Sequence, residues 1–137
     1  MKLLRFFVPL IFATAAYGQH HPSAEGYSPV TTKILLQQVL ADSGLQNREI
    51  KMMIVDFPPN GGSAPHRHPC PTFGYVLEGE IESVFEGKTY HYTKGDYFYE
   101  VTNGLHSASR NNHPTQAARL LVFFVGEKGK PTSILEK

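Results

Sequence analysis

Closely spaced turn residues divide most of this 137-residue chain into segments that are too short for most helices. From Val30 onward these segments are rich in β-branched and aromatic residues and are separated by Gly, Pro, Asn and Asp. The clearest turns are PPNGGS (58–63), Glu78-Gly79, Glu86-Gly87-Lys88 and KGD (94–96). Short strands that recur about every 8–12 residues and are joined by such turns are typical of β-sandwiches and β-barrels. We therefore expect an all-β domain.

Eight segments have the composition of strands, and one has that of a short helix. The expected strands cover residues 31–36, 49–57, 73–77, 80–86, 88–93, 97–101, 105–110 and 119–125. The only helix candidate is QQVLADSGL (37–45). In a small antiparallel barrel built from such strands, alternate side chains point inward and can enclose one small ligand.

The first 18 residues have the pattern of a secretory signal peptide. Lys2 and Arg5 flank the start of an apolar run, and the small residues that follow offer cleavage sites. The alternative is an N-terminal anchor helix, but Pro9 and the short run disfavour a span of about 20 residues. We therefore expect an exported protein, periplasmic or extracellular, that is not membrane-bound once the signal is removed.

The expected signal peptide (1–18) is followed by three further parts. A polar arm is expected over residues 19–29, the barrel over 30–126 and a tail over 127–137. The full chain has a formal net charge of +1, so its charge gives no indication of nucleic-acid binding. Because Cys70 is the single cysteine, the chain cannot form an internal disulfide.

Two of the seven histidines, His66 and His68, have the spacing of ligands on one face of a strand. In an extended segment, side chains at positions i and i+2 project from the same face, about 6–7 Å apart. One transition metal can join two such imidazoles, and His106 in a later expected strand could supply a third nitrogen. An H-x-H pair also fits two surface histidines near a loop, and from these residues alone both interpretations stay open.

The sequence around the first two histidines resembles the first motif of the cupin superfamily. In APHRHPCPTFGYVLEGE, His66 and His68 match the H-x-H of that motif, and Gly79 matches its final glycine. Thr72 stands where the family has a glutamate, and Asn60 stands where it has the first glycine.

The stretch KGDYFYEVTNGLH resembles the second cupin motif. Gly95 and His106 match this motif in residue type and spacing. Val101 replaces the proline of the motif, Asn103 its second glycine and Arg110 its final asparagine.

The resemblance covers about residues 28–126 and implies a fold and a metal centre. The implied fold is the small, single-domain, RmlC-like jelly roll, an all-β antiparallel barrel, preceded here by the N-terminal arm. The implied ligands are His66, His68 and His106, which would hold one divalent transition metal: Fe, Mn, Ni, Cu or Zn. Thr72 cannot supply the carboxylate that is the usual fourth ligand in the family, and some cupin oxygenases use three histidines without it.

The resemblance favours a metal-dependent, dioxygenase-like enzyme that acts on a small enolic, phenolic or thiol substrate. The alternative is a cupin that binds or senses a small ligand or a metal without turnover. A metal-free isomerase on the same barrel is a third hypothesis, and the intact H-x-H matches it poorly. Cupins often form dimers through barrel edges, so a homodimer is also expected.

Three residues outside the histidine set are candidates for catalysis. Glu100 lies six residues before His106 and is a candidate acid, base or additional ligand. Tyr75 belongs to aromatic residues at strand spacing, which line a pocket if they do not form core. Arg110 has the same parity as His106 and would pair with an anionic substrate or end a strand.

Cys70, between two prolines, is either a thiol near the metal or a free cysteine in a rigid turn.

Overall fold

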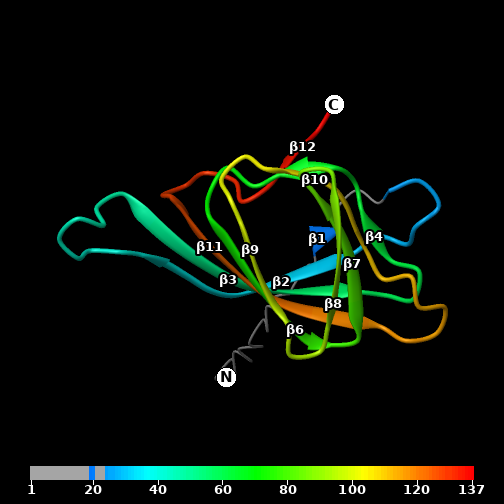
Figure 1. The fold of residues 1–137 in the computed structure, drawn as a ribbon. Coiled ribbons are helices and arrows are strands. Elements are labelled where there is room, and N and C mark those ends of the chain that lie inside the picture. The colour runs from blue at the N-terminus through cyan, green and yellow to red at the C-terminus, as the bar shows by residue number, and fades with distance from the viewer. Residues whose placement is uncertain (1–18, 21–23) are drawn as a thin grey trace, which may run out of the picture.

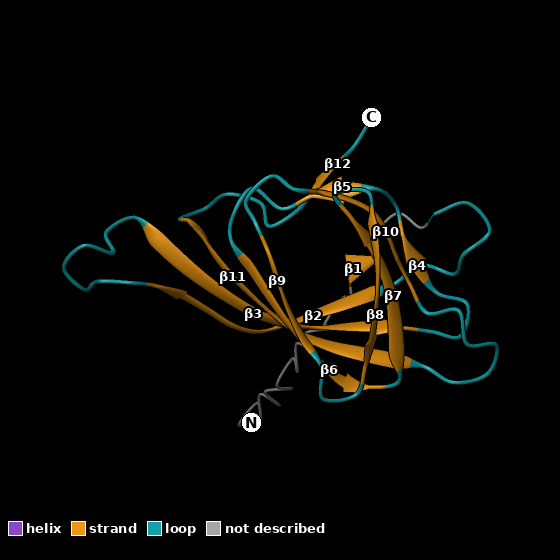
Figure 2. Cartoon of the chain, viewed as in Figure 1, coloured by secondary structure: helices purple, strands orange, loops and turns teal. Residues whose placement is uncertain are grey.

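The computed structural model describes residues 19–20 and 24–137 (Figure 1). The signal peptide expected over residues 1–18 therefore lies outside the described residues. Within the described part, the chain forms twelve strands joined by turns and loops, with no helix (Figure 2). Consequently, no helix in this part of the chain is long and apolar enough to cross a membrane.

The strands form two sheets. The first sheet has the order β1-β2-β3-β11-β6-β9, and the second has the order β12-β5-β10-β7-β8, with β4 also paired to β10. The strands of the first sheet are β1 (Gln19–His20), β2 (Thr31–Val39), β3 (Arg48–Phe57), β6 (Thr72–Glu78), β9 (Tyr97–Glu100) and β11 (Ala118–Glu127). Those of the second are β4 (Gly62–Ser63), β5 (His66–Arg67), β7 (Glu80–Phe85), β8 (Lys88–Thr93), β10 (Leu105–Arg110) and β12 (Ile134–Leu135).

All strand pairs within both sheets are antiparallel, and the arrangement is that of a jelly roll. The all-β expectation is therefore confirmed. The expectation of a closed barrel is not confirmed. Over residues 19–20 and 24–137, the strands form two separate sheets, and no strand pairing closes them into a barrel. Residues 127–137, expected to be a tail, contain β12, which pairs with β5.

Apolar side chains from both sheets form the core between them. Along β11, alternate residues Leu120, Val122 and Phe124 are buried, as the two-residue period of a strand requires. Val76 on β6 is fully buried and Ile81 on β7 is 2% exposed, so the core includes residues of both sheets. The remaining members of the buried cluster are Val30, Met53, Phe57, Cys70 and Ala118.

The expected helix over residues 37–45 is wrong. Residues 37–39 continue β2, which pairs with β3 along its length. Beyond Val39, the amide of Leu40 donates a hydrogen bond to the carbonyl of Arg48, so the segment forms the end of a long hairpin. Cross-strand hydrogen bonds to β3 thus satisfy the backbone groups that an isolated helical turn would have left to solvent.

Aromatic side chains on the outer face of the first sheet remain exposed. Phe73 and Tyr75 of β6 point away from the core, since they alternate with the buried residues of that strand. The paired strand β9 adds Tyr99 opposite Phe73, and Tyr97 opposite Tyr75. Tyr97 is 81% exposed and Tyr99 56%. These four residues, called here the aromatic face, form two cross-strand pairs at the edge of the sheet.

Gly74 makes room for an aromatic ring inside the protein. It lies on β6 opposite Phe98 of β9, and a Cβ atom on Gly74 would overlap the Phe98 ring. The Phe98 ring therefore lies over Gly74, in the space that a larger side chain would occupy. The same ring packs on Tyr92 with ring centroids 5.1 Å apart. A glycine at this strand position is explained by this close approach.

We predict that Gly74→Ala destabilises the protein by about 1–3 kcal/mol, because the added methyl group overpacks the core against Phe98. The matched control is Gly126→Ala in β11, where the new Cβ would make an ordinary contact of 3.7 Å with Cys70. The control should change the free energy of unfolding by less than about 0.5 kcal/mol. Urea unfolding of both variants measures the difference, and equal stability of the two would contradict the prediction.

Candidate metal centre

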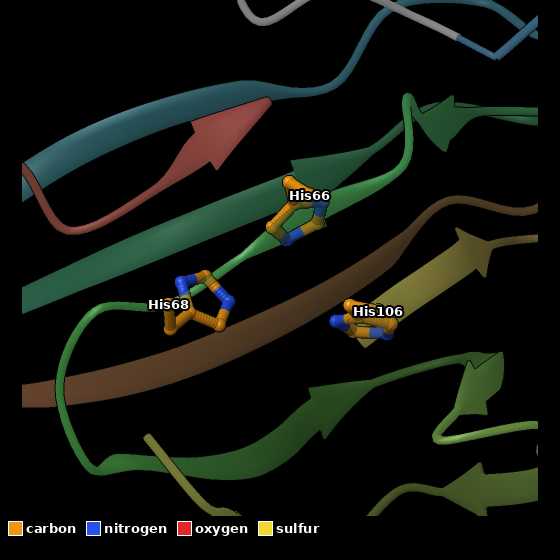
Figure 3. A group of neighbouring side chains, drawn as sticks. All are labelled: His66, His68 and His106. Carbon is orange, nitrogen blue, oxygen red and sulfur yellow. The ribbon is translucent and has the colours of Figure 1, made fainter. Parts of the chain in front are cut away.

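Strand pairing brings the three predicted histidines together. In the pairing of β10 with β5, His106 is the direct partner of His66, so their side chains lie on the same face. His68 follows β5 and returns to that face two residues later. One nitrogen from each ring lies within 4.8 Å of the others (Figure 3). Residues 40 positions apart in the sequence thus converge on one point.

A bulge in β10 directly after His106 changes which of the later side chains face inward. In the pairing of β10 with β7, His106 lies opposite Phe85 but Ala108 lies opposite Val84, which leaves Ser107 as the extra residue. Such a bulge inverts the alternation of side chains that follow it. His106 is 5% exposed, and the next buried residue on the strand is Ser109.

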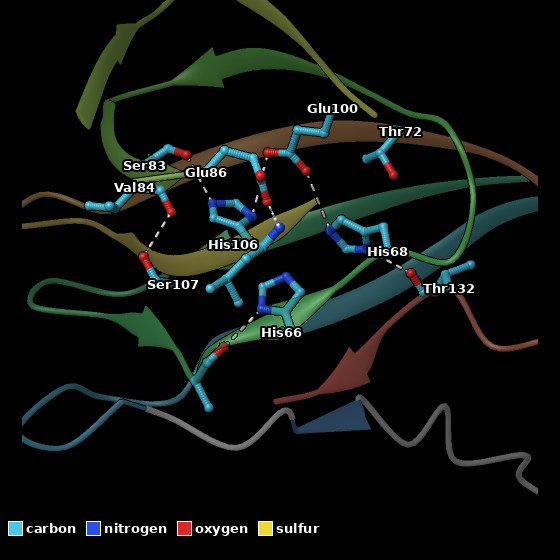
Figure 4. Close-up of polar contacts among 12 residues, drawn as sticks. His66, His68, Thr72, Ser83, Val84, Glu86, Glu100, His106, Ser107 and Thr132 are labelled. Carbon is cyan, nitrogen blue, oxygen red and sulfur yellow. Dashed lines mark hydrogen bonds and ion pairs between the residues drawn. The ribbon is translucent and has the colours of Figure 1, made fainter. Parts of the chain in front are cut away.

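Each histidine has one ring nitrogen engaged with the surrounding protein (Figure 4). Nδ1 of His66 donates to the carbonyl of Ala64 at 2.8 Å, and Nδ1 of His68 donates to the carbonyl of Thr132 at 2.6 Å. Nε2 of His106 lies 2.9 Å from Oγ of Ser83. Hydrogen bonds of this kind fix the orientation and the tautomer of metal-binding histidines. The remaining ring nitrogens are Nε2 of His66, Nε2 of His68 and Nδ1 of His106.

Glu100 lies beside two of these remaining nitrogens. Its Oε2 is 3.6 Å from Nε2 of His68, and its Oε1 is 3.4 Å from Nδ1 of His106 (Figure 4). Burial raises the pKa of Glu100 to about 7. Burial, together with the neighbouring His66 and His68, lowers the pKa of His106 to about 3. Desolvation thus favours the neutral form of both side chains.

The donor set fits a divalent transition metal. Nδ1 of His106 and Oε2 of Glu100 are buried without a hydrogen-bond partner, which is costly unless a cation or another polar group compensates. A neutral imidazole is the form that binds a metal, and His106 is neutral at physiological pH because burial lowers its pKa. Imidazole nitrogens suit Zn, Cu, Fe and Ni. The three histidines could therefore hold one metal ion.

The other candidates from the sequence lie elsewhere. Tyr75 belongs to the exposed aromatic face of the first sheet. Arg110 pairs with Glu82 on β7, with Nε 2.6 Å from Oε1, because the bulge after His106 breaks the parity expected between them. Cys70 is buried in the core, and burial raises the pKa of its thiol, which disfavours the thiolate that binds metals.

Sequence analysis missed the groups that orient the rings. Ser83 lies on the inward face of β7, and Ile81 two residues before it gives the signal: it is apolar, buried and has the same parity. Thr132 reaches His68 because the C-terminal segment folds back onto β5. There β12 pairs with β5, and Arg67 forms an ion pair with Glu136 at 2.8 Å. No local pattern near Thr132 indicates this long-range contact.

Comparisons with known proteins agree with this fold. The family profile described as "Cupin domain" matches residues 53–124, and no match was found among curated proteins. The cupin domain of Cnp3 from Schizosaccharomyces pombe aligns at 14% identity over 72% of this chain and 65% of its own, with a TM-score of 0.60.

Two further solved structures have enzymatic descriptions. The DMSP lyase DddQ from Ruegeria pomeroyi DSS-3 aligns at 19% identity over 86% of this chain and 60% of its own, with a TM-score of 0.62. A candidate acetylacetone dioxygenase from Methylibium petroleiphilum PM1 aligns at 18% identity over 90% of this chain and 82% of its own, with a TM-score of 0.55. The chain thus spans less than two thirds of the Cnp3 domain and of the lyase. At these identities the likeness shows the fold.

We predict that Ser83→Ala weakens Zn²⁺ binding by about tenfold or more, because it removes the hydroxyl that orients His106. Ser107→Ala is the matched control: Ser107 is next to His106, but its hydroxyl donates to the carbonyl of Val84 at 3.2 Å. Chelator competition measures both dissociation constants. Equal affinities in the two variants would show that the Ser83 contact does not orient the ring.

Proposed function

The chain belongs to the cupin family, and from this premise we propose that it is a mononuclear metal-binding cupin that acts as an oxygenase on a small organic substrate. The observation that carries the proposal is the convergence of His66, His68 and His106 within 4.8 Å, on strands whose pairing fixes their positions. Cupins bind small-molecule ligands, and the same face of the fold would receive the substrate.

A metal bound to the three histidines would act as a Lewis acid on an oxygen-containing substrate and provide a binding place for dioxygen. The chain supplies the other requirements. Ala64, Thr132 and Ser83 hold the three rings in fixed orientations. Phe124 packs against His68 with ring centroids 5.1 Å apart, and Phe85 packs against His106 at 6.0 Å. These apolar rings limit access of water to the histidines.

The substrate class in the proposal is a small enolic, phenolic or thiol compound. The similarity to the candidate acetylacetone dioxygenase supports the choice of a dioxygenase and of enolic substrates. The proposed metal is one of Fe, Mn, Ni, Cu or Zn, of which Fe, Ni, Cu and Zn are suited to imidazole ligands. We also propose that the protein is exported, on the strength of the charged and apolar pattern of residues 1–18.

We predict that the protein, purified without an affinity tag, carries near one equivalent of transition metal and that His106→Ala carries almost none. The control is His91→Ala, since His91 is an exposed residue of β8 outside the cluster. Mass spectrometry measures metal content. Oxygen uptake with diketones, phenols and thiols then tests turnover. A wild-type protein without metal after reconstitution would contradict the proposal, and metal without oxygen uptake would leave a binding or sensing cupin.

The proposal includes a homodimer in which the aromatic face is covered. Phe73, Tyr75, Tyr97 and Tyr99 are each at least 44% exposed, and clustered aromatic side chains are typical of protein interfaces. We predict a dimer mass in light scattering and a shift to monomer for Tyr99→Glu, because burial of the new carboxylate is costly. Tyr90→Glu on β8 of the other sheet is the control. A monomeric wild type would contradict this part of the proposal.

A further inference from the structure

Thr72 stands where the first cupin motif usually has a glutamate, and its hydroxyl cannot supply the negative charge of a carboxylate ligand. Thr72, at this position, begins β6, is 1% exposed and donates a hydrogen bond from its Oγ to the carbonyl of Cys70 at 3.2 Å. Three neutral imidazoles would leave both positive charges of a divalent ion uncompensated in a buried site, which is unfavourable.

Strand pairing places a carboxylate directly opposite Thr72. In the antiparallel pairing of β6 with β9, Thr72 is the direct partner of Glu100. Direct partners in a sheet project from the same face. Glu100 therefore enters the same interior space from the neighbouring strand, where it is 4% exposed.

The carboxylate lies on the inner side of the histidine rings. The nitrogens that it approaches, Nε2 of His68 and Nδ1 of His106, are the ones opposite to those held by Thr132 and Ser83. A carboxylate that only oriented a metal-binding histidine would lie at the outer nitrogen. In Figure 4, Glu100 lies between His68 and His106, on the side opposite the orienting groups of both rings.

The distances are close to those expected between two ligands of one ion. Donor atoms bonded to one metal at about 2.0–2.1 Å are about 2.8–3.4 Å apart when the bond angles are about 90–110°. The separation of 3.4 Å from Glu100 to His106 is at the upper end of this range, and that of 3.6 Å to His68 is slightly above it. An ion in this place would also compensate Oε2 of Glu100 and Nδ1 of His106, which are otherwise buried without hydrogen-bond partners.

We propose that Glu100 is the fourth protein ligand of the metal centre, its carboxylate coming from β9 in place of the one missing at Thr72. The inference rests on the proposed metal centre and deepens it. Its chemical consequence is a site with three imidazoles and one carboxylate, in which the carboxylate offsets half of the charge of a divalent ion.

The test compares metal affinity in two variants of Glu100. Glu100→Gln removes the charge while keeping the shape, and Glu100→Asp keeps the charge but withdraws the carboxylate by one methylene. A carboxylate that binds the metal directly needs both its negative charge and the full length of the glutamate side chain. The Zn²⁺ dissociation constants of both variants, measured by chelator competition, should therefore rise by at least about tenfold. The visible spectrum of bound Co²⁺, which reports ligand number, should also change in both.

Glu49→Gln is the matched control, because Glu49 is a glutamate 5% exposed that contacts Gln37 and Lys51. Its affinity should stay within about threefold of wild type. If either Glu100 variant matches this control, Glu100 is not a ligand; a loss in Glu100→Gln alone would indicate an effect of charge. If Glu100→Gln does not fold, Glu100→Asp decides alone.

The failure of this inference is distinguishable from that of the proposed function. Metal binding that depends on His106 but not on Glu100 would overturn the inference alone. A Glu100-dependent metal centre without oxygen uptake would overturn the oxygenase alone. A wild-type protein that binds neither Zn²⁺ nor Co²⁺ would overturn both.

Discussion

The pairing of β10 with β5 is the constraint on which the candidate metal centre depends. It makes His106 the direct partner of His66, and a shift of one residue would turn His106 to the opposite face. β5 is only two residues long, so this register cannot be maintained by β5 alone. It is reinforced where β10 pairs with β4 and β7 on the same sheet, and where β12 pairs with the free edge of β5. The geometry of the site is therefore a property of the whole second sheet.

The polar groups of the centre are buried at a free-energy cost that a bound cation would offset. Glu100 and His106 are each about 95% buried, and desolvation shifts both pKa values toward the neutral forms. Oε2 of Glu100 and Nδ1 of His106 are buried without a hydrogen-bond partner. A fold stabilised by apolar packing retains such groups when they serve binding or chemistry, because an apolar residue would otherwise be more stable at the same position.

Much of the fold could be predicted because turn residues and strand periodicity are local signals. The strands over 88–93 and 105–110 end at the expected residues. The three histidines were found by spacing and by resemblance. The helix over 37–45 was wrong because cross-strand pairing overrides weak local propensity. Arg110 was expected to share the face of His106, but alternation alone does not reveal the bulge at Ser107.

The features that the sequence could not reveal are contacts between segments far apart in the chain. The contact of Ser83 with His106, the facing of Glu100 and Thr72, and the hydrogen bond of Thr132 to His68 join residues 23, 28 and 64 positions apart. A sequence motif describes one segment of the chain at a time. The first motif therefore shows that Thr72 stands at the glutamate position, but it cannot show that a carboxylate lies on the neighbouring strand. In a sheet, direct partners on paired strands lie on the same face with Cβ atoms about 4.5–5.5 Å apart, so their side chains reach the same site. A functional group can therefore move from one strand to the next without changing the chemistry of the site, and the pairing register then describes the site better than either motif.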